Sequence, residues 1–265
     1  MLLLNPNRTP SALDRFEEII APARDNQLAV FLDYDGTLTP IVGEPEAALL
    51  SDSMRETLQQ LASRVALAIL SGRDLDDVRT RVGIPNIIYA GSHGFDIAGP
   101  DGLRRQMASE FLPELDTAEK KLQQALNGIS GARVERKRLS IAAHYRNVKE
   151  DEIPKVKQAV GEVAWCHREL RKMTGRKVHE LQPDIDWDKG RTLIWLLETL
   201  GLKRDNVFPI YIGDDRTDED AFRAVNSRGI SILVSEQWRP TAAKYSLRDP
   251  DEVEEFLRAL AREQK

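Results

Sequence analysis

Two aspartates, Asp33 and Asp35, are separated by one residue and lie between an apolar run and Gly36. In an extended backbone, residues i and i+2 share a face, so both carboxylates can point at one site. Paired acids repel each other unless a shared proton or a cation relieves them, and Mg²⁺ prefers such oxygen ligands. One carboxylate can then act as a nucleophile and the other as a general acid and base. Taken alone, the motif is equally compatible with a strand end followed by an Asp-Gly turn.

A second acidic cluster, Gly213–Asp218 (GDDRTD), also follows an apolar run. A solvated loop before a helix can carry acids for a different reason, because carboxylates are favourable near a helix N-terminus. Asp214 and Asp215 nevertheless come directly after a strand-like segment, where uncompensated carboxylates are costly. Together with Asp33 they favour a metal site over a solvated loop.

Two further side chains can hold an anion. Lys189 follows Asp188, which resembles an N-cap, and the start of a helix is a natural anion site. A lysine there can hold a phosphoryl group, although most lysines are simply exposed. Ser71 lies at a strand end and can donate to a phosphate oxygen, although serine is also a common cap residue. His93 lies in a glycine-rich turn, where histidine is more often structural than catalytic.

Uninterrupted apolar runs lead into these motifs, at residues 28–32, 65–70, 87–90 and 207–212. Runs of this length are typical of strands that are buried on both faces of a parallel sheet. The carboxyl ends of such strands meet along one edge, where ligands bind in open α/β folds. We therefore expect motifs about 180 residues apart, from 33 to 214, to converge in space.

The middle of the chain predicts a small α+β domain inserted into this α/β core. Amphipathic helices are predicted over 109–129 and 152–169, with strands over 133–138 and 140–146 between them. Thr174-Gly175 is a hairpin signal between strand-like segments 168–173 and 176–182. The predicted domains are a catalytic core of 1–107 and 184–265, and an α+β cap domain of 108–183.

Composition narrows the function classes. The chain has 265 residues, 41% of them hydrophobic, which is enough for one large α/β domain or a domain with an insert. A net charge of −5 without a strongly basic tract argues against a nucleic-acid partner. The single Cys166 fits a reducing compartment, and there is no apolar run of about 18 residues to span a bilayer. We therefore expect a cytoplasmic protein with no membrane partner.

These motifs, in this order, resemble those of the haloacid dehalogenase (HAD) superfamily of phosphotransferases, which uses DxDGT, a strand-end Ser or Thr, a Lys and GDDxxD. The resemblance implies a HAD-like fold, with a parallel-sheet Rossmannoid core and an inserted α+β cap. It implies a magnesium-dependent phosphatase in which Asp33 forms an aspartyl-phosphate. Asp35 would protonate the departing alkoxide and then activate the hydrolytic water.

The same resemblance assigns the other polar residues of the motifs. Two would bind the transferring phosphoryl group, namely Ser71 and Lys189. Several would hold or support Mg²⁺: Asp33, the main-chain carbonyl of Asp35 and Asp214 as ligands, with Asp215 or Asp218 supporting them.

A narrower resemblance, to the trehalose-6-phosphate phosphatase family, covers about residues 28–222. The motifs that carry it are LDYDGTL, LSGR, GSHG, HYR, WDKG and YIGDDRTDEDAF. It implies a small sugar phosphate as the substrate and functional coupling to a separate trehalose-6-phosphate synthase. It also implies residues that contact the sugar or line the cleft: Glu135, Lys137, Arg146 and Glu180 from the cap, and Arg73 and His93 from the core.

Other interpretations stay open. A related phosphatase for sucrose-6-phosphate or mannosyl-3-phosphoglycerate would share the core chemistry and differ in the cap. A receiver-like switch module would also use an acidic cluster and a lysine, but it needs neither Asp35 nor a cap. A non-catalytic regulatory subunit of a trehalose-synthesising complex is the third alternative, and the complete acidic set argues against it.

Overall fold

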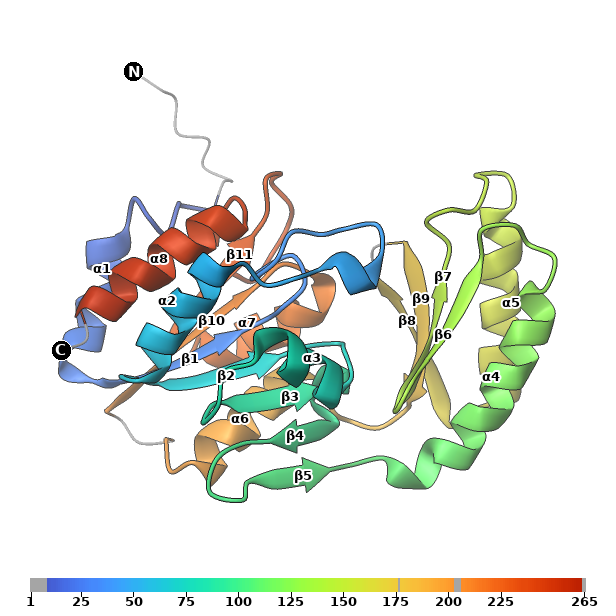
Figure 1. Cartoon of the computed structure of the whole chain (residues 1–265), viewed down its shortest axis with the longest axis horizontal. Coiled ribbons are helices and arrows are strands. Elements are labelled where there is room, and N and C mark those ends of the chain that lie inside the picture. Colours follow the sequence, from blue (N-terminus) through green and yellow to red (C-terminus); the bar gives the residue numbers. More distant parts are fainter. Residues whose placement is uncertain (1–8, 176, 203–205, 264–265) are drawn as a thin grey trace. The chain divides into compact units, whose positions relative to one another are not determined.

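The computed structural model describes residues 9–175, 177–202 and 206–263. The chain divides into two compact units, Met1–Arg104 with Trp187–Lys265, and Arg105–Asp186. We call the first the core unit and the second the inserted unit (Figure 1). The predicted domain boundaries, after residues 107 and 183, lie a few residues inside the second unit.

The described residues of the core unit are organised around an eight-stranded sheet of order β12-β11-β10-β1-β2-β3-β4-β5, whose last strand, β5, begins at the end of the core unit and continues into the first residues of the inserted unit. Its strands are β1 (Gln27–Leu32), β2 (Ala66–Leu70), β3 (Ile88–Gly91), β4 (Asp96–Ala98), β5 (Arg104–Gln106), β10 (Val207–Gly213), β11 (Ile230–Val234) and β12 (Tyr245–Leu247). The pairs from β12 to β3 are parallel, and β3 pairs with β4 in the antiparallel direction. The four predicted apolar runs are therefore confirmed as the adjacent strands β10, β1, β2 and β3.

Helices cover both faces of this sheet, as Figure 1 shows. One face packs against α1 (Phe16–Ile20), α2 (Asp52–Ala62), α3 (Leu75–Val82) and α8 (Pro250–Glu263), and the other against α6 (Lys189–Thr199) and α7 (Glu219–Val225). Within β1, Val30 lies in the first of these clusters and Phe31 in the second. Burial on both faces explains why the strands are continuous apolar runs rather than alternating ones.

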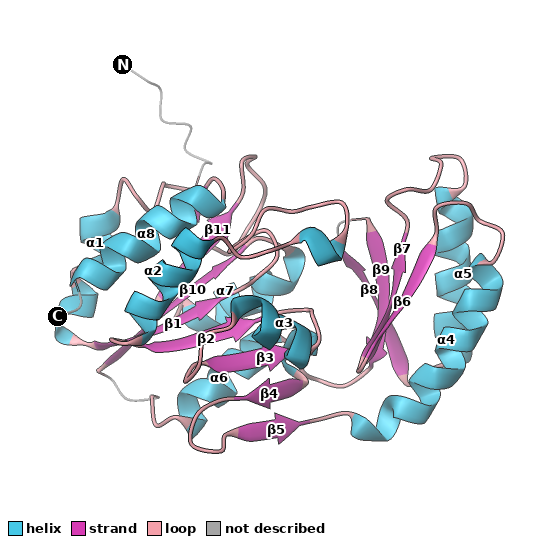
Figure 2. Cartoon of the chain, in the orientation of Figure 1, coloured by secondary structure: helices cyan, strands magenta, loops and turns pink. Residues whose placement is uncertain are grey.

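The inserted unit has an antiparallel sheet of order β6-β7-β9-β8, with two helices on one face (Figure 2). Its elements are α4 (Leu112–Leu126), β6 (Arg133–Lys137), β7 (Ser140–His144), α5 (Ile153–Cys166), β8 (Leu170–Gly175) and β9 (Val178–Pro183). The predicted order of helix, two strands, helix, two strands is confirmed. The hairpin turn is displaced, because Thr174 and Gly175 still pair with β9; Arg176 lies outside the described residues.

Short 3-10 helices complete the described elements: η1 (Pro22–Asp25), η2 (Pro45–Ala47), η3 (Ser92–Gly94), η4 (Ser109–Phe111) and η5 (Arg216–Asp218). Within the described part of the chain, none of the helices combines the length and the apolar character that crossing a membrane requires.

Candidate active site

The predicted acidic motifs meet at the carboxyl edge of the central strands. Asp33 directly follows β1, and its backbone N–H donates to the carbonyl of Ile212 on β10 at 2.9 Å. The GDD motif begins at the last residue of β10, so the register of these two strands brings both motifs to one place. The expected convergence of distant motifs is confirmed, because parallel neighbours end at the same edge of a sheet.

Lys189 links the two acidic motifs. It is the first residue of α6, and the N-cap Asp188 accepts from the backbone N–H of Arg191 at 2.8 Å. Its Nζ donates to Asp33 Oδ1 at 2.6 Å and to Asp218 Oδ1 at 2.7 Å. The lysine side chain is 2% exposed, so these two carboxylates are its counter-charges in a buried setting. Breaking such a pair by removing one partner is strongly destabilising, because it leaves a buried charge uncompensated.

Each carboxylate oxygen of Asp218 accepts two hydrogen bonds. Its Oδ1 accepts from Lys189 and from the Tyr211 hydroxyl, the latter at 2.6 Å. Its Oδ2 accepts from the backbone N–H groups of Asp214 at 3.1 Å and Asp215 at 2.9 Å. Two hydrogen bonds to each oxygen fill the usual capacity of a carboxylate. Asp218 therefore organises the motif, and direct metal ligation would have to displace one of these donors.

Two glycines allow the acids to approach this closely. A Cβ on Gly36 would lie 2.2 Å from Asp214 Oδ2, and the backbone of Gly36 has a φ of +85°. A Cβ on Gly213 would lie 2.4 Å from the side-chain carbon Cγ of Asp218. The side chains of Asp214 and Asp218 thus occupy the space that a Cβ at these two positions would need.

The electrostatics of the cluster fit a bound cation. Burial raises the pKa of Asp33 to about 8, against the opposing effect of Lys189. Burial also raises the pKa of Asp214 well above its ordinary value, and the charges of Asp33 and Asp218 add to this. For Lys189, burial lowers the pKa, but the charges of Asp218 and Asp33 outweigh it and raise the pKa well above normal. One lysine is too little positive charge to keep all these carboxylates ionised at low cost.

The donor set is also suited to a divalent ion. Carboxylate oxygens of Asp33, Asp214 and Asp218 lie within 4.8 Å of one another. Carboxylate oxygens are hard ligands of the type that Mg²⁺ prefers. Both oxygens of Asp218 already accept two hydrogen bonds each. Asp33 and Asp214 are therefore the two aspartates of this group whose oxygens fit direct ligation of a metal ion. Asp215 is partly buried beside them, and its backbone N–H is one of the donors to Asp218.

Asp35 is held by Arg73. Nε and Nη2 of the guanidinium donate to Asp35 Oδ2 at 2.7 Å and Oδ1 at 2.6 Å. The third nitrogen, Nη1, donates to Asp77 at 2.9 Å, and the guanidinium carbon lies 5.4 Å from the ring centroid of Tyr34. The Arg73 side chain is 10% exposed and that of Asp35 is 44% exposed. A two-pronged arginine pair of this kind fixes the position and the plane of a carboxylate.

Ser71 and His93 lie at the ends of neighbouring strands. Ser71 is buried directly after β2, and its Oγ accepts from the backbone N–H of Arg73 at 3.1 Å. The serine hydroxyl keeps its own proton to donate to an anion. The backbone N–H of His93 donates to the carbonyl of Ser71 at 2.9 Å, and the His93 ring packs beside Gly72. His93 has a φ of +58°, so the tight turn itself constrains this histidine.

The inserted unit presents a polar face on its sheet. Ile141, Ala143 and Leu181 pack towards the helices, so the residues between them point to the opposite face. The ladder places Glu135, Ala142 and Glu180 side by side on that face. Three of the predicted cap residues therefore share it, namely Glu135, Lys137 and Glu180, whereas Arg146 is exposed beyond the end of β7.

An ion pair and two hydrogen bonds involve the predicted residues of this polar face. Lys137 Nζ lies 3.1 Å from Glu180 Oε1, and Glu180 also accepts from the hydroxyl of Ser140. Glu135 Oε2 lies 2.6 Å from His144 Nε2, and this hydrogen bond lowers the pKa of the Glu135 carboxyl. The face is thus lined by charged and polar side chains that pair with one another.

Sequence reasoning missed several residues of the core cluster. Asp77 lies on α3 and follows Arg73 by four residues, but Arg73 precedes the helix, so the ion pair could not be inferred from helical spacing. Arg239 donates from Nη2 to the carbonyl of Asp214 at 3.0 Å and has no motif around it. Tyr211 lies in an apolar strand, where a tyrosine is indistinguishable in sequence from a packed aromatic residue.

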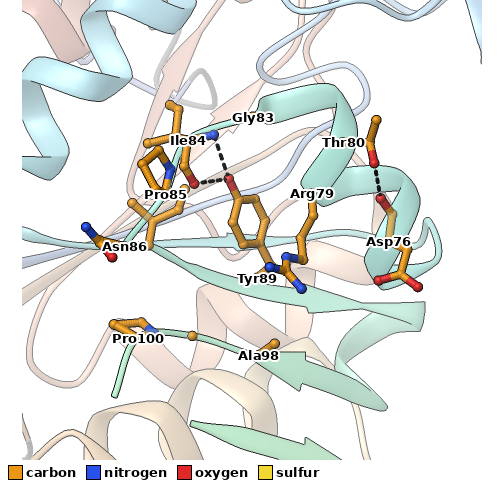
Figure 3. A pocket seen from close by; sticks show the side chains of 12 residues that line it. Asp76, Arg79, Thr80, Gly83, Ile84, Pro85, Asn86, Tyr89, Ala98 and Pro100 are labelled. Carbon is orange, nitrogen blue, oxygen red and sulfur yellow. Dashed lines mark hydrogen bonds between the residues drawn. The ribbon is translucent and has the colours of Figure 1, made fainter. Parts of the chain in front are cut away.

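A separate pocket of about 750 Å³ lies on the core unit between α3, β3 and β4 (Figure 3). Its lining includes Asp76, Arg79, Asn86 and Tyr89, and the Tyr89 hydroxyl donates to the carbonyl of Ile84 at 2.7 Å. None of the predicted site residues is among the residues that line it. The predicted site residues of the core unit therefore lie at the carboxyl edge of the sheet and not in this pocket.

Comparisons with known proteins show which family this chain resembles. The trehalose-phosphatase family model matches residues 31–251. A trehalose 6-phosphate phosphatase of Zea mays is 46% identical over 269 residues, covering 95% of this chain and 74% of that protein. Trehalose-phosphate phosphatase B of Arabidopsis thaliana is 43% identical, covering 96% of this chain and 71% of that protein. The C-terminal domain of the C. albicans trehalose-6-phosphate phosphatase has a TM-score of 0.85 at 25% identity, covering 96% of this chain and 99% of that chain. The predicted α/β fold class is confirmed.

Proposed function

Because this chain belongs to the trehalose-phosphatase family, we propose that it hydrolyses trehalose 6-phosphate to trehalose and inorganic phosphate. The observation that carries the proposal is the buried pair of Asp33 and Lys189, joined at 2.6 Å beside Asp214. This pair supplies an anionic nucleophile and a fixed positive charge at the carboxyl edge of a parallel sheet. Phosphoryl transfer needs little more from a protein than positioning and charge neutralisation.

Asp33 is the proposed nucleophile. Its carboxylate oxygen attacks the phosphorus, the bond from phosphorus to the sugar oxygen breaks, and an aspartyl-phosphate forms. A water molecule then attacks this phosphorus, releases inorganic phosphate and restores the carboxylate. Lys189 and Ser71 are the proposed ligands of the phosphoryl oxygens; the contact of Lys189 with Asp33 and the free hydroxyl proton of Ser71 support this.

Asp35 is the proposed acid and base. It gives a proton to the departing sugar oxygen in the first step and takes one from the attacking water in the second. Its side chain is 44% exposed at the strand end, which suits a group that exchanges protons with substrate and water. Arg73 holds both oxygens of this carboxylate, so its main role in this proposal is to orient Asp35.

Magnesium is the proposed metal. Asp33, Asp214 and the main-chain carbonyl of Asp35 would hold it, with Asp215 and Asp218 supporting the acidic loop. When bound, it supplies charge neutralisation for the phosphoryl oxygens and for the carboxylates. The raised pKa values of Asp33 and Asp214 support this assignment, because a nearby cation would favour their ionised forms.

The polar face of the inserted unit is the proposed sugar-binding surface. Glu135, Lys137 and Glu180 offer charged donors and acceptors on one face of the sheet, which disaccharide hydroxyls can bind. Arg146 is a further candidate at the end of β7. His93 is a further candidate for a substrate contact, and its backbone hydrogen bond to the carbonyl of Ser71 supports this.

Two expectations about the setting of this reaction stay predictions. One is a cytoplasmic location, which the single cysteine favours. The other is functional coupling to a separate trehalose-6-phosphate synthase.

Phosphate release by the purified protein with Mg²⁺ tests the proposed function. We expect turnover of trehalose 6-phosphate to exceed that of glucose-6-phosphate, sucrose-6-phosphate and mannosyl-3-phosphoglycerate. Asp33→Asn, which keeps the shape and removes the nucleophile, should lower kcat more than about 10³-fold, and a chelator should abolish turnover. Preference for another sugar phosphate would overturn the assignment of the polar face. Full activity of Asp33→Asn would overturn the assignment of Asp33 as the nucleophile.

A further inference from the structure

Tyr211 is a buried tyrosine whose hydroxyl ends in the acidic cluster. It lies on β10, its side chain is fully buried, and its hydroxyl donates to Asp218 Oδ1 at 2.6 Å. The ring packs edge-to-face against Phe222, with centroids 5.8 Å apart and an angle of 78°. The strand β10 and the neighbouring ring of Phe222 therefore fix the position of the Tyr211 hydroxyl.

The Tyr211 hydroxyl shares its acceptor atom with Lys189. Both groups bond to Asp218 Oδ1, and Lys189 continues to Asp33 Oδ1 at 2.6 Å. The other oxygen of Asp218 is held by backbone N–H groups. Lys189 is a long, flexible side chain with a freely rotating ammonium group, so its direction depends on where its acceptors lie. The position of Oδ1, set in part by Tyr211, thus decides how well Lys189 points at Asp33.

We propose that Tyr211 is a positioning residue of the phosphatase reaction, which aligns Lys189 on the nucleophile through Asp218. Tyr211 itself lies behind Asp218 and takes no part in bond making or breaking. The proposal builds on the proposed function in that it assigns Lys189 to the phosphoryl group and Asp33 to the attack. Buried hydrogen-bond networks of this kind lose more than one bond when one member is removed.

The variant Tyr211→Phe removes only the hydroxyl and keeps the ring against Phe222. We expect kcat to fall about tenfold while KM changes less than about twofold, because positioning of Lys189 matters most when charge develops in the transition state. The matched control is Tyr89→Phe, since Tyr89 is also buried in the core unit and, among the described residues, its hydroxyl bonds only to the backbone of Ile84 (Figure 3). This control should lose stability to a similar extent and keep kcat.

Equal kcat values for wild type and Tyr211→Phe would overturn the proposal. So would an equal loss of kcat in Tyr89→Phe, because the effect would then follow from lost stability alone. The same comparison with p-nitrophenyl phosphate separates this proposal from the choice of sugar. If wild type hydrolyses only p-nitrophenyl phosphate, the sugar assignment fails and the role of Tyr211 is still measured.

A crystal structure of Tyr211→Phe supplies a readout that does not depend on turnover. We expect the Lys189 ammonium to shift so that its bond to Asp33 Oδ1, 2.6 Å in the native chain, is lengthened or lost. An unchanged Lys189 with both bonds intact would contradict the proposal, even if the wild-type protein were inactive on every phosphate ester. Failure of the proposed function and failure of the Tyr211 proposal are therefore distinguishable.

Discussion

At the scale of single residues, the donors around each acid decide what that acid can do. Asp218 is filled by four hydrogen bonds, two to each oxygen, and so organises its neighbours. Burial and neighbouring acids raise the pKa of Asp214, and a bound cation would oppose this by favouring the ionised carboxylate. Asp35 faces a guanidinium on both oxygens. Acids of the same type thus have three different environments within one cluster.

The contact between Arg73 and Asp35 leads to the first prediction. Arg73→Gln removes both bonds to Asp35, so the proposed acid and base loses its fixed orientation. We expect kcat for trehalose 6-phosphate to fall about tenfold or more with KM nearly unchanged. Arg81→Gln is the matched control, because Arg81 bonds to Asp77 at 2.8 Å and, within the described part of the chain, makes no hydrogen bond to Asp35. A raised KM with an unchanged kcat would instead assign Arg73 to the sugar.

His179 gives a prediction about pH and stability. It is buried on β9, with its ring 4.9 Å from that of Tyr145. Burial lowers its pKa from 6.5 to about 4, and the charges of Lys172 and Lys157 add to this. The unfolded chain therefore binds more protons than the folded chain between these two pH values, so stability is full above about pH 6.5 and falls as the pH drops towards 4.

From pH 7 to pH 5, this single group should lower the free energy of unfolding by about 2 kcal/mol. Urea unfolding of wild type and His179→Gln at both pH values measures it. The variant lacks the titrating ring, so its loss of stability between pH 7 and pH 5 should be smaller by about that amount. The same pH dependence in both proteins would show that His179 titrates normally in the folded chain.

At the scale of elements, the site depends on strand ends and on the tight turns that follow them. Parallel pairing of β1 with β10 sets Asp33 beside the GDD motif, and α6 begins with Lys189 pointing into the same place. The turns need unusual backbone, since Gly36 and His93 both have positive φ values. Strand register thus brings the acidic motifs to one edge of the sheet, and the turns that follow the strands set the close contacts between the acidic side chains.

Gly36→Ala tests the importance of this turn. The added Cβ would lie 2.2 Å from Asp214 Oδ2, so it would push the acid out of the cluster. We expect turnover to fall more than about 100-fold and the Mg²⁺ concentration for half-maximal activity to rise. Gly102→Ala is the control, because Gly102 also has a positive φ, of +75°, but nothing lies within 4 Å of its added Cβ.

Both alanines carry the backbone cost of a positive φ, about 1 kcal/mol. Urea unfolding of Gly102→Ala should show this loss, with turnover retained. Retained turnover in Gly36→Ala as well would mean that Asp214 can move aside without harm to the reaction.

At the scale of the whole molecule, the two compact units carry different parts of the proposed function. The core unit holds the acidic cluster with Lys189, and the inserted unit holds the polar face with Glu135, Lys137 and Glu180. Such a division predicts that changes in the inserted unit alter which ester is hydrolysed and leave the phosphoryl chemistry intact.

Glu180→Gln tests this division. Glu180 accepts from Lys137 and Ser140, so the neutral amide weakens the charge pairing on the polar face. We expect KM for trehalose 6-phosphate to rise about tenfold, with turnover of p-nitrophenyl phosphate unchanged. Lys172→Gln is the control, because Lys172 lies on the helix side of the same sheet and bonds to the carbonyl of Lys157. Equal loss on both substrates would argue against a sugar-binding role for Glu180.

The sequence by itself determined the framework of this protein. Continuous apolar runs predicted four buried parallel strands, because burial on both faces of a parallel sheet leaves no polar alternation, and these strands are the neighbours β10, β1, β2 and β3. The convergence of Asp33 with the GDD motif followed from the rule that parallel strands end at one edge. Helix and strand order in the inserted unit could be predicted as well, since amphipathic periodicity is a local property.

Only the tertiary structure decided how the acids are paired. Sequence order does not reveal that Arg73 holds Asp35, or that Tyr211 and Lys189 share one oxygen of Asp218. The hairpin turn near Gly175 also lies later than its local signal predicts, because pairing with β9 extends β8. In each case the partner is chosen by strand register and side-chain direction across distant segments, and hydrogen bonds form or fail over a few tenths of an ångström. Local patterns carry no information at that precision.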